Sequence, residues 1–211
     1  MLTPMSADSK ATQGRSTRDR ARTAAGARPS VGVRLPRFPI PRKFGKHRTL
    51  IRPLGPGDRD TLLRFFGSHT RETIHLRYGY ELSEISDARA AELVGVDQSR
   101  DAALGIFEEG QEVPLVAIGR YFLRRDGNSA EAAFVVREDR RHLGMATALL
   151  KALLRIAASR GVKSLDAQVL RENQPMLEIF GRMGGTRSGI PGTDSVVVSV
   201  DVARALRRPP G

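Results

Sequence analysis

The stretch Glu138–Gly161, EDRRHLGMATALLKALLRIAASRG, decides how the rest of this chain is organised. It opens with the charged segment Glu138–His142, and the apolar residues that follow recur at helical spacing until Gly161 ends the pattern. A helix that begins here leaves its first backbone N–H groups unpaired, and the positive end of its dipole lies at the same place. Gly144 and Ala146 are small, so an anion can approach that backbone closely. The stretch therefore predicts a diphosphate-binding loop at the start of a long helix.

Three segments before this helix read as strands, because apolar and β-branched residues dominate them. They are Ala102–Phe107, Val113–Leu123 and Ala130–Arg137. The pairs Glu109-Gly110 and Asp126-Gly127 stand between them, and both pairs are typical of tight hairpin turns. We therefore expect an antiparallel meander that leads into the helix.

A short strand and three helices are expected before the meander. The strand is Thr49–Leu54, and Asp58 is well placed to cap the first helix. The second helix follows Thr70, and the third runs from Ser86 to Val94.

Two strands and a helix are expected after the long helix. Leu165–Val169 alternates as a strand, Asn173 starts a helix that runs through Met183, and Asp194–Val202 is the last strand. This order predicts an α+β fold: one domain with a mixed, mostly antiparallel sheet of six to seven strands flanked by helices, preceded by a disordered basic tail.

The net charge of +12 is distributed unevenly along the chain. Residues 1–48 hold twelve Lys and Arg against two Asp, a charge of +10, which leaves +2 for residues 49–211. The Pro-, Arg- and Ser-rich residues 1–46 carry few large apolar side chains and cannot bury enough surface to offset the entropy of ordering. We therefore expect a disordered basic tail at 1–46, one domain at 47–205 and a C-terminal tail at 206–211.

Composition excludes several classes of protein. The chain has no cysteine, which excludes a disulfide framework, a thiolate metal site and an acyl-cysteine intermediate. Its four histidines stand in unrelated contexts, so no metal cofactor is expected. No apolar run approaches the ~20 residues that a membrane helix needs, and the N-terminus lacks the apolar segment of a secretory signal. A cytoplasmic protein with no membrane partner is the expectation.

The order of elements, with Arg141-x-x-Gly144-x-Ala146 between the fourth strand and the next helix, resembles the GNAT acetyltransferase superfamily over roughly residues 49–203. Four short motifs look closer to the acetyltransferase domain of bacterial Pat-type protein-lysine acetyltransferases. They are Ile51-Arg52-Pro53, His75–Tyr78, Ala130-Glu131 and Leu170–Leu177. The resemblance implies an acyltransferase whose co-substrate is acetyl-CoA.

The resemblance also implies where acetyl-CoA binds. Its pantetheine arm would lie in a gap between the fourth and fifth strands and pair with the backbone of Val135, Val136 and Arg137. Its diphosphate would accept the backbone N–H groups of Arg141, His142, Leu143, Gly144, Met145 and Ala146, the place that the helix start indicates independently. The side chains of Arg140, Arg141 and His142 either add charge near the phosphates or are solvated.

Asn173 resembles the residue of the family that contacts pantetheine or assists the acceptor, and it also reads as a simple helix cap. The two roles are compatible. Phe180 stands where many relatives have a tyrosine that protonates the departing thiolate, so that acid is absent. A thiolate whose parent thiol has a pKa of about 8.5 can leave without much help.

Acyl transfer to an amine requires a base, because a lysine amine is protonated at neutral pH. Glu131 is the candidate: it is a carboxylate in an apolar strand, on one face with Ala133 and Val135, where burial would raise its pKa. The resemblance places the catalytic glutamate of the family here too, whereas the competing interpretation is a strand-end charge that faces solvent. The backbone N–H of Val136 would polarise the thioester oxygen, and attack would be direct because no cysteine can carry the acetyl group.

Three functions remain open from the sequence. The Pat-type motifs favour N-acetylation of protein lysine. Gly185, which stands where an aromatic residue is usual in the family, and the absence of a fused partner domain favour a small amine instead. The third is a non-catalytic acyl-CoA-sensing or nucleic-acid-associated module, whose basic tail contacts nucleic acid or an acidic protein.

Overall fold

The computed structural model describes residues 35–78 and 85–207, without the side chains of Ile74, Leu76, Arg77 and Tyr78. Residues 1–34 of the expected basic tail and 208–211 of the expected C-terminal tail lie outside the described residues, so those predictions stay untested. Within the described ranges, no helix is long and apolar enough to cross a membrane.

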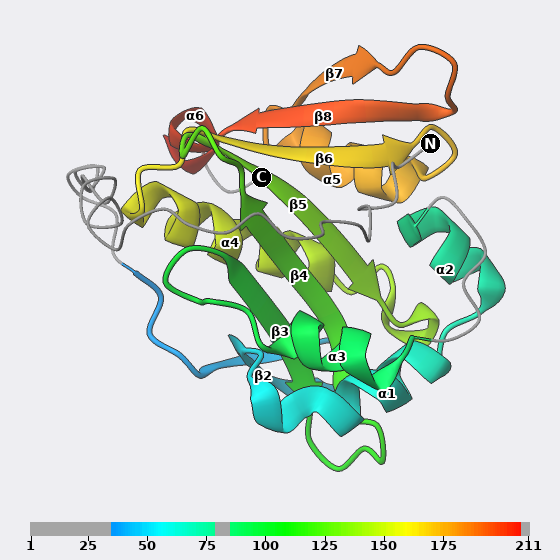
Figure 1. Cartoon of the computed structure of the whole chain (residues 1–211). Coiled ribbons are helices and arrows are strands. Elements are labelled where there is room, and N and C mark those ends of the chain that lie inside the picture. Colours follow the sequence, from blue (N-terminus) through cyan, green and yellow to red (C-terminus); the bar gives the residue numbers. More distant parts are fainter. Residues whose placement is uncertain (1–34, 79–84, 208–211) are drawn as a thin grey trace, which may run out of the picture.

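Among the described residues, eight strands form one sheet in the order β1-β2-β3-β4-β5-β6-β8-β7 (Figure 1). All neighbours are antiparallel except β5 and β6, which are parallel. The α+β class and the mixed, mostly antiparallel sheet are confirmed, whereas the expected count of six to seven strands is wrong because β1 and β7 were missed. The strands are β1 (Ile40–Phe44), β2 (His47–Pro53), β3 (Ala102–Glu108), β4 (Leu115–Leu123), β5 (Ser129–Val136), β6 (Ser164–Leu170), β7 (Thr186–Gly189) and β8 (Ser195–Asp201).

Strand β1 lies inside the segment that was expected to be a tail, so the boundary at residue 46 is wrong. It pairs with β2 across the turn at Gly45, and Phe44 is buried against the main core. Pro41 is tolerated because β1 is an edge strand, which needs hydrogen bonds on one side only. Prolines and exposed cations hide the strand pattern in the sequence.

The C-terminal part also holds elements that the sequence did not predict. Strand β7 consists of four exposed residues without a large apolar side chain, so no alternation marks it. Helix α6 (Val202–Arg207) follows β8, and its Leu206 packs on the main core, so the domain continues past the expected boundary at residue 205.

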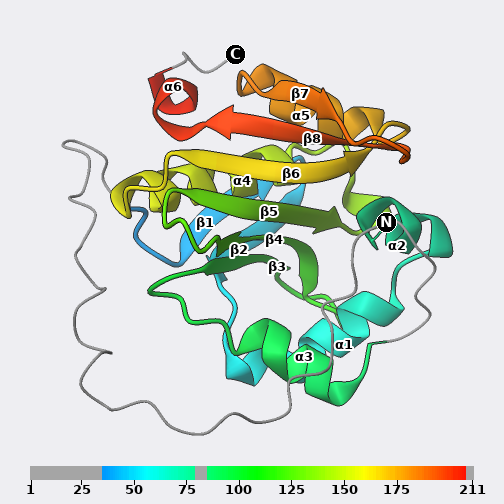
Figure 2. The same ribbon diagram turned by 45° about the horizontal axis from the view of Figure 1, so that its top comes forward.

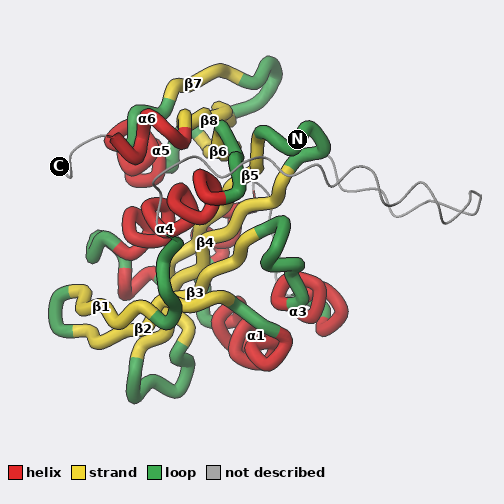
Figure 3. Tube along the Cα trace, turned by 90° about the vertical axis from the view of Figure 1, so that its left-hand side faces the viewer, coloured by secondary structure: helices red, strands yellow, loops and turns green. Residues whose placement is uncertain are grey.

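Helices cover both faces of the sheet, as Figure 3 shows. Helices α4 (Met145–Ser159) and α5 (Gln174–Arg182) lie on one face, and α1 (Arg59–Gly67) and α3 (Asp87–Val94) lie on the other. Each layer encloses its own hydrophobic core, and the larger one lies between the sheet and α4. The periodicity of the opening stretch thus predicted the central helix correctly.

Three shorter helices complete the fold: η2 (Pro56–Asp58), α2 (Arg71–Tyr78) and η3 (Glu138–Arg140). Asp58 was expected to cap α1 but does not, because its carboxylate accepts two hydrogen bonds from Arg52, at 2.7 and 2.8 Å, and one from the N–H of Gly55 at 2.9 Å. These bonds tie the end of β2 to the start of α1.

Strands β5 and β6 separate in the middle of the sheet. Their ladder covers only Ser129 to Glu131 of β5, although β5 continues to Val136 and β6 continues to Leu170. The two strands diverge in Figure 1, and α2 lies at the wide end of the gap, where it contacts both of them (Figures 1 and 2). The expected gap between the fourth and fifth predicted strands is therefore present, between β5 and β6.

Candidate active site

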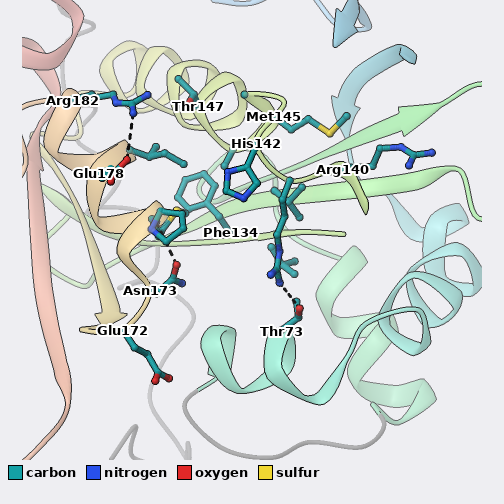
Figure 4. Close-up of a pocket in the computed structure, with 18 of the residues that line it drawn as sticks. Thr73, Phe134, Arg140, His142, Met145, Thr147, Glu172, Asn173, Glu178 and Arg182 are labelled. Atoms are coloured by element: carbon teal, nitrogen blue, oxygen red, sulfur yellow. Dashed lines mark hydrogen bonds and ion pairs between the residues drawn. The ribbon is translucent and has the colours of Figure 1, made fainter. Parts of the chain in front are cut away.

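A cavity of about 580 Å³ lies at the wide end of this gap, between the end of β5, the start of α4, α5 and α2 (Figure 4). Three of the eleven expected site residues do not line it: Glu131, Arg137 and Leu143. The other eight do: Val135, Val136, Arg141, His142, Gly144, Met145, Ala146 and Asn173. The cavity therefore brings most of the candidate cofactor residues together and leaves out the candidate base.

The segment Arg141–Ala146, hereafter the diphosphate loop, has the backbone shape of an anion site. His142 (φ 61°) and Gly144 (φ 83°) both adopt left-handed conformations, on either side of Leu143. Such alternation turns successive N–H groups toward one side and makes a concave site for an anion. Helix α4 begins at Met145, so the N–H groups of its first turn have no partner within the helix. The geometry is what a diphosphate requires, and the individual contacts stay predictions.

Two of the expected contact residues point elsewhere. The side chain of Leu143 packs against the main core, so only its backbone can serve the site. The N–H of Arg137 donates to the carbonyl of Val116 on β4 at 2.9 Å, and its guanidinium donates to Asp139 at 2.7 Å. The structure therefore does not bring Arg137 to the cavity, because its backbone belongs to the β4–β5 ladder.

Backbone groups along β5 alternate between its two neighbouring strands. Since Arg137 directs its N–H to β4, the N–H groups of Val136 and Phe134 face the gap. Val135 turns its backbone to β4, and its side chain packs against the core beneath α1 and α3, although the residue borders the cavity. The contact of Val136 with pantetheine thus stays a prediction, and the N–H of Phe134 has the same orientation.

Phe134 is a cavity residue that the sequence analysis missed. Its ring packs edge-on against the buried ring of Phe180, with 5.9 Å between centroids. Gly119 lies opposite on β4, and a Cβ there would come within 2.9 Å of the Phe134 ring. A phenylalanine in an apolar strand reads as ordinary core, so only the pairing of β4 with β5 shows what the glycine makes room for.

Glu131 is exposed and lies where β5 and β6 begin to separate, beside Asp166 on β6 and opposite Phe122 on β4. The burial expected for it is not found, because the core beneath α1 and α3 extends over β3 and β4 only as far as Val135 of β5. Val135 lies four positions further along the strand than Glu131, a rise of about 13 Å. Its role as the base rests on its position and stays a prediction.

Arg140 lines the cavity but is held by the protein. Its Nε donates to Glu108 at 2.7 Å, and the Nδ1 of His47 lies 2.6 Å from the same carboxylate. Burial alone would raise the pKa of Glu108, but the hydrogen bonds from Arg140 and His47 outweigh it and hold that pKa below its usual range. Arg140 therefore anchors η3 to β2 and β3.

The remaining cations of the cavity come from different elements. Arg141 belongs to the diphosphate loop, and its guanidinium donates to the hydroxyl of Thr73 on α2. Arg182 belongs to α5 and lies 3.4 Å from Glu178 on the next turn. Figure 4 shows Arg182 and Thr73 on opposite sides of the cavity, with His142 between them. The cavity thus offers positive charge from two walls.

Helix α2 forms one wall of the cavity, and none of its residues was among the expected site residues. Glu72 and Thr73 line it, and the Nε2 of His75 lies 3.5 Å from Glu172, which belongs to the turn before α5. These contacts join segments about a hundred residues apart, so no local pattern could indicate them.

Asn173 has the capping role that its sequence context predicts. Its side chain accepts the N–H of Met176 at 3.3 Å at the start of α5, and the residue also lines the cavity. Capping is therefore confirmed, whereas contact with pantetheine stays a prediction.

Comparison with known proteins agrees with this arrangement. Residues 68–184 match the model of the acetyltransferase (GNAT) family. The chain is 27% identical over 141 residues to an acetyltransferase of Pseudomonas aeruginosa, across 66% of this chain and 75% of that protein. It is 32% identical over 136 residues to acetyltransferase Pat of Mycolicibacterium smegmatis, across 64% of this chain but only 40% of Pat. The crystal structure of the GNAT domain of S. lividans PAT has a TM-score of 0.66 at 23% identity, over 73% of this chain and 90% of that domain.

The family match spans the meander, the diphosphate loop and α4, and the two parallel strands diverge beside that loop. The Pat proteins among the relatives agree with the motifs that pointed to Pat-type enzymes. The chain therefore belongs to the GNAT acetyltransferase family, as an acyltransferase whose co-substrate is acetyl-CoA.

Proposed function

We propose that this acetyltransferase transfers the acetyl group of acetyl-CoA to the side-chain amine of a protein lysine. The observation that supports it most is the cavity, which joins the left-handed diphosphate loop to the gap-facing backbone of β5. The choice of lysine rests on the likeness to acetyltransferase Pat and on the short Pat-type motifs.

In this proposal the diphosphate of coenzyme A binds the N–H groups of the diphosphate loop, close to the positive end of the α4 dipole. The pantetheine arm then runs along β5 toward Glu131. It pairs with the part of β5 from which β6 has diverged. Val136 donates its N–H to a pantetheine amide, and Asn173, the N-cap of α5, borders the same cavity. The arm thus points the thioester at the narrow end of the gap.

The reacting atoms lie between Phe134 and Glu131 in this arrangement. Of the gap-facing N–H groups that border the cavity, that of Phe134 is two residues closer to Glu131 than that of Val136, so it is the better donor to the thioester oxygen. Glu131 removes a proton from the lysine ammonium, directly or through a water. The neutral amine attacks the thioester carbon; the C–N bond forms, the C–S bond breaks, and the coenzyme A thiolate leaves with the electron pair. The thiolate takes up the second proton, which the nitrogen loses as the amide forms.

Acetylation of candidate proteins, read by mass spectrometry, tests this function. Wild type with acetyl-CoA should produce acetyl-lysine, and Glu131→Gln should lower the rate by about 10²- to 10⁴-fold, the usual contribution of a general base. Glu109→Gln, which changes an exposed carboxylate in the β3–β4 turn, is the matched control and should act as wild type. Equal rates for Glu131→Gln and wild type would remove Glu131 from the mechanism. Turnover of spermidine-like amines with none on proteins would replace lysine by a small amine.

A further inference from the structure

We infer that Thr73 is a positioning residue of the cofactor site, which holds Arg141 and Glu138 in place and so docks α2 on the diphosphate loop. The inference rests on the proposed coenzyme A site, but it concerns a residue on an element that carries none of the expected cofactor contacts.

The hydroxyl of Thr73 forms hydrogen bonds with two side chains of opposite charge. It donates to the carboxylate of Glu138, and it accepts a hydrogen bond from the guanidinium of Arg141, as the dashed line in Figure 4 shows. Thr73 is only 4% exposed, so water competes weakly for either contact. Hydrogen bonds to charged groups are stronger than those between neutral groups, which makes this hydroxyl a firm link between α2 and the loop.

Glu138 completes the link by capping α2 from a distant part of the chain. One of its oxygens accepts the backbone N–H of Thr70 at 2.8 Å and the hydroxyl of Thr70 at 2.9 Å, in addition to the hydroxyl of Thr73. Burial alone would raise the pKa of Glu138, but these donors outweigh it and lower the pKa to about 2. The carboxylate therefore stays charged at the N-terminal end of α2, where the helix dipole favours a negative charge.

Helix α2 also reaches the opposite wall of the cavity. His75 lies 3.5 Å from Glu172 in the turn before α5, but both side chains are largely exposed, at 45% and 61%, so this pair holds the wall weakly. Among the described side chains of α2, Thr73 therefore provides a stronger attachment to the cavity walls than His75 does.

The consequence for binding follows from the orientation of Arg141. An arginine with several rotatable bonds loses conformational entropy when an anion immobilises it, and a guanidinium held beforehand loses less. Because Thr73 holds Arg141 at the edge of the diphosphate loop, it should favour acetyl-CoA binding. It should leave the chemical step alone, since Glu131 lies at the other end of the gap-facing segment of β5.

The test compares three variants by calorimetric binding of acetyl-CoA and by steady-state kinetics. Thr73→Val keeps the shape but removes the hydroxyl, and Thr73→Ser restores it. Thr49→Val is the matched control, because Thr49 is equally buried at 3% and its hydroxyl donates to the carbonyl of Arg42 at 2.8 Å, on β2 and outside the cavity lining.

We expect Thr73→Val to weaken acetyl-CoA binding and raise its KM about tenfold, with kcat within about twofold of wild type. Thr73→Ser should recover most of the affinity, and Thr49→Val should bind as wild type even where it lowers the melting temperature. S-acetylpantetheine, which lacks the diphosphate, should react equally well with wild type and Thr73→Val. The inference would be overturned if Thr73→Val lost activity equally with acetyl-CoA and with S-acetylpantetheine. It would also be overturned if Thr73→Val bound acetyl-CoA as tightly as Thr49→Val does.

Two further variants keep the outcome decisive. If Thr73→Val does not fold, Glu138→Gln removes the charge from the same link, and unchanged affinity for acetyl-CoA in that variant would overturn the inference. Gly144→Glu tests the site itself: if it binds acetyl-CoA as wild type does, the proposed coenzyme A site fails. If Gly144→Glu loses binding while Thr73→Val keeps it, only the role of Thr73 fails.

Discussion

Two walls of the cavity, the diphosphate loop and α2, differ in how far apart their residues lie in the sequence. The diphosphate loop is six consecutive residues, and its left-handed positions, His142 and Gly144, are two residues apart. The wall formed by α2 depends on contacts between Thr70 or Thr73 and the segment of Glu138 and Arg141, across 65 to 68 positions of sequence. A local wall can be recognised from a motif, whereas a wall built from remote contacts is visible only after the sheet has brought its parts together. We therefore ask whether these two walls also differ in what they contribute to acetyl-CoA binding and to stability.

The largest effect should come from the loop wall. Gly144→Glu places a carboxylate in the diphosphate loop, where it repels the diphosphate of acetyl-CoA. Gly144 has a φ of 83°, a left-handed conformation that strains a residue with a Cβ, so both effects oppose binding. We expect acetyl-CoA to raise the melting temperature of wild type and leave that of Gly144→Glu unchanged. Gly127→Glu is the control, because Gly127 also has a positive φ of 67° with open space around it, but in the β4–β5 turn. If acetyl-CoA also fails to raise the melting temperature of Gly127→Glu, backbone strain alone explains the loss of binding in Gly144→Glu.

The floor of the cavity should be the next most sensitive part. A Cβ at Gly119 would lie 2.9 Å from the Phe134 ring and 3.0 Å from the Cβ of Leu149, so Gly119→Val must displace that ring. Overpacking of this kind costs about 1–3 kcal/mol of unfolding free energy, and here it should also weaken acetyl-CoA binding. Denaturant unfolding and calorimetry measure the two effects. Gly67→Val, at an open position at the end of α1, should change neither.

The wall formed by α2 should respond to pH through Glu138. Its pKa is lowered to about 2 in the folded protein, so its stabilising contribution is complete above an unfolded pKa near 4.5 and is lost as the pH falls toward 2. After allowance for solvent screening, we expect Glu138→Gln to lose about 1–2 kcal/mol at pH 7. The difference from wild type should shrink between pH 5 and about pH 2, as measured by urea unfolding. A difference that stays constant over this range would mean that the charge of Glu138 does not hold α2.

The smallest effect should separate the two roles of Asn173. Asn173→Ala removes the cap of α5 and should cost about 1 kcal/mol of stability. Asn173→Asp keeps the cap but loses the side-chain N–H donors that pantetheine could use. Weaker acetyl-CoA binding in both variants would indicate contact with the cofactor, whereas full affinity in Asn173→Asp would leave only the cap.

The errors of the sequence analysis share one cause. Strands β1 and β7 carry little alternation of their own, and they exist because β2 and β8 offer unpaired edges. Asp58 was a good local candidate for a helix cap, but its carboxylate forms an ion pair with Arg52 on β2 instead. The expected burial of Glu131 followed from the apolar residues around it in the strand, yet its exposure depends on where α1 and α3 stop covering the sheet. In each case a contact with another element outweighed the local pattern.

The meander, the long helix α4 and the loop before it could be predicted from the sequence, because hydrophobic periodicity and turn residues act over a few positions. The sequence also excluded a cysteine of this chain as an acetyl carrier, because the chain has none. Which N–H groups of β5 face the gap became clear from the folded sheet, since it depends on the hydrogen bonds that β5 already makes with β4. The folded structure also placed Thr73 between Glu138 and Arg141.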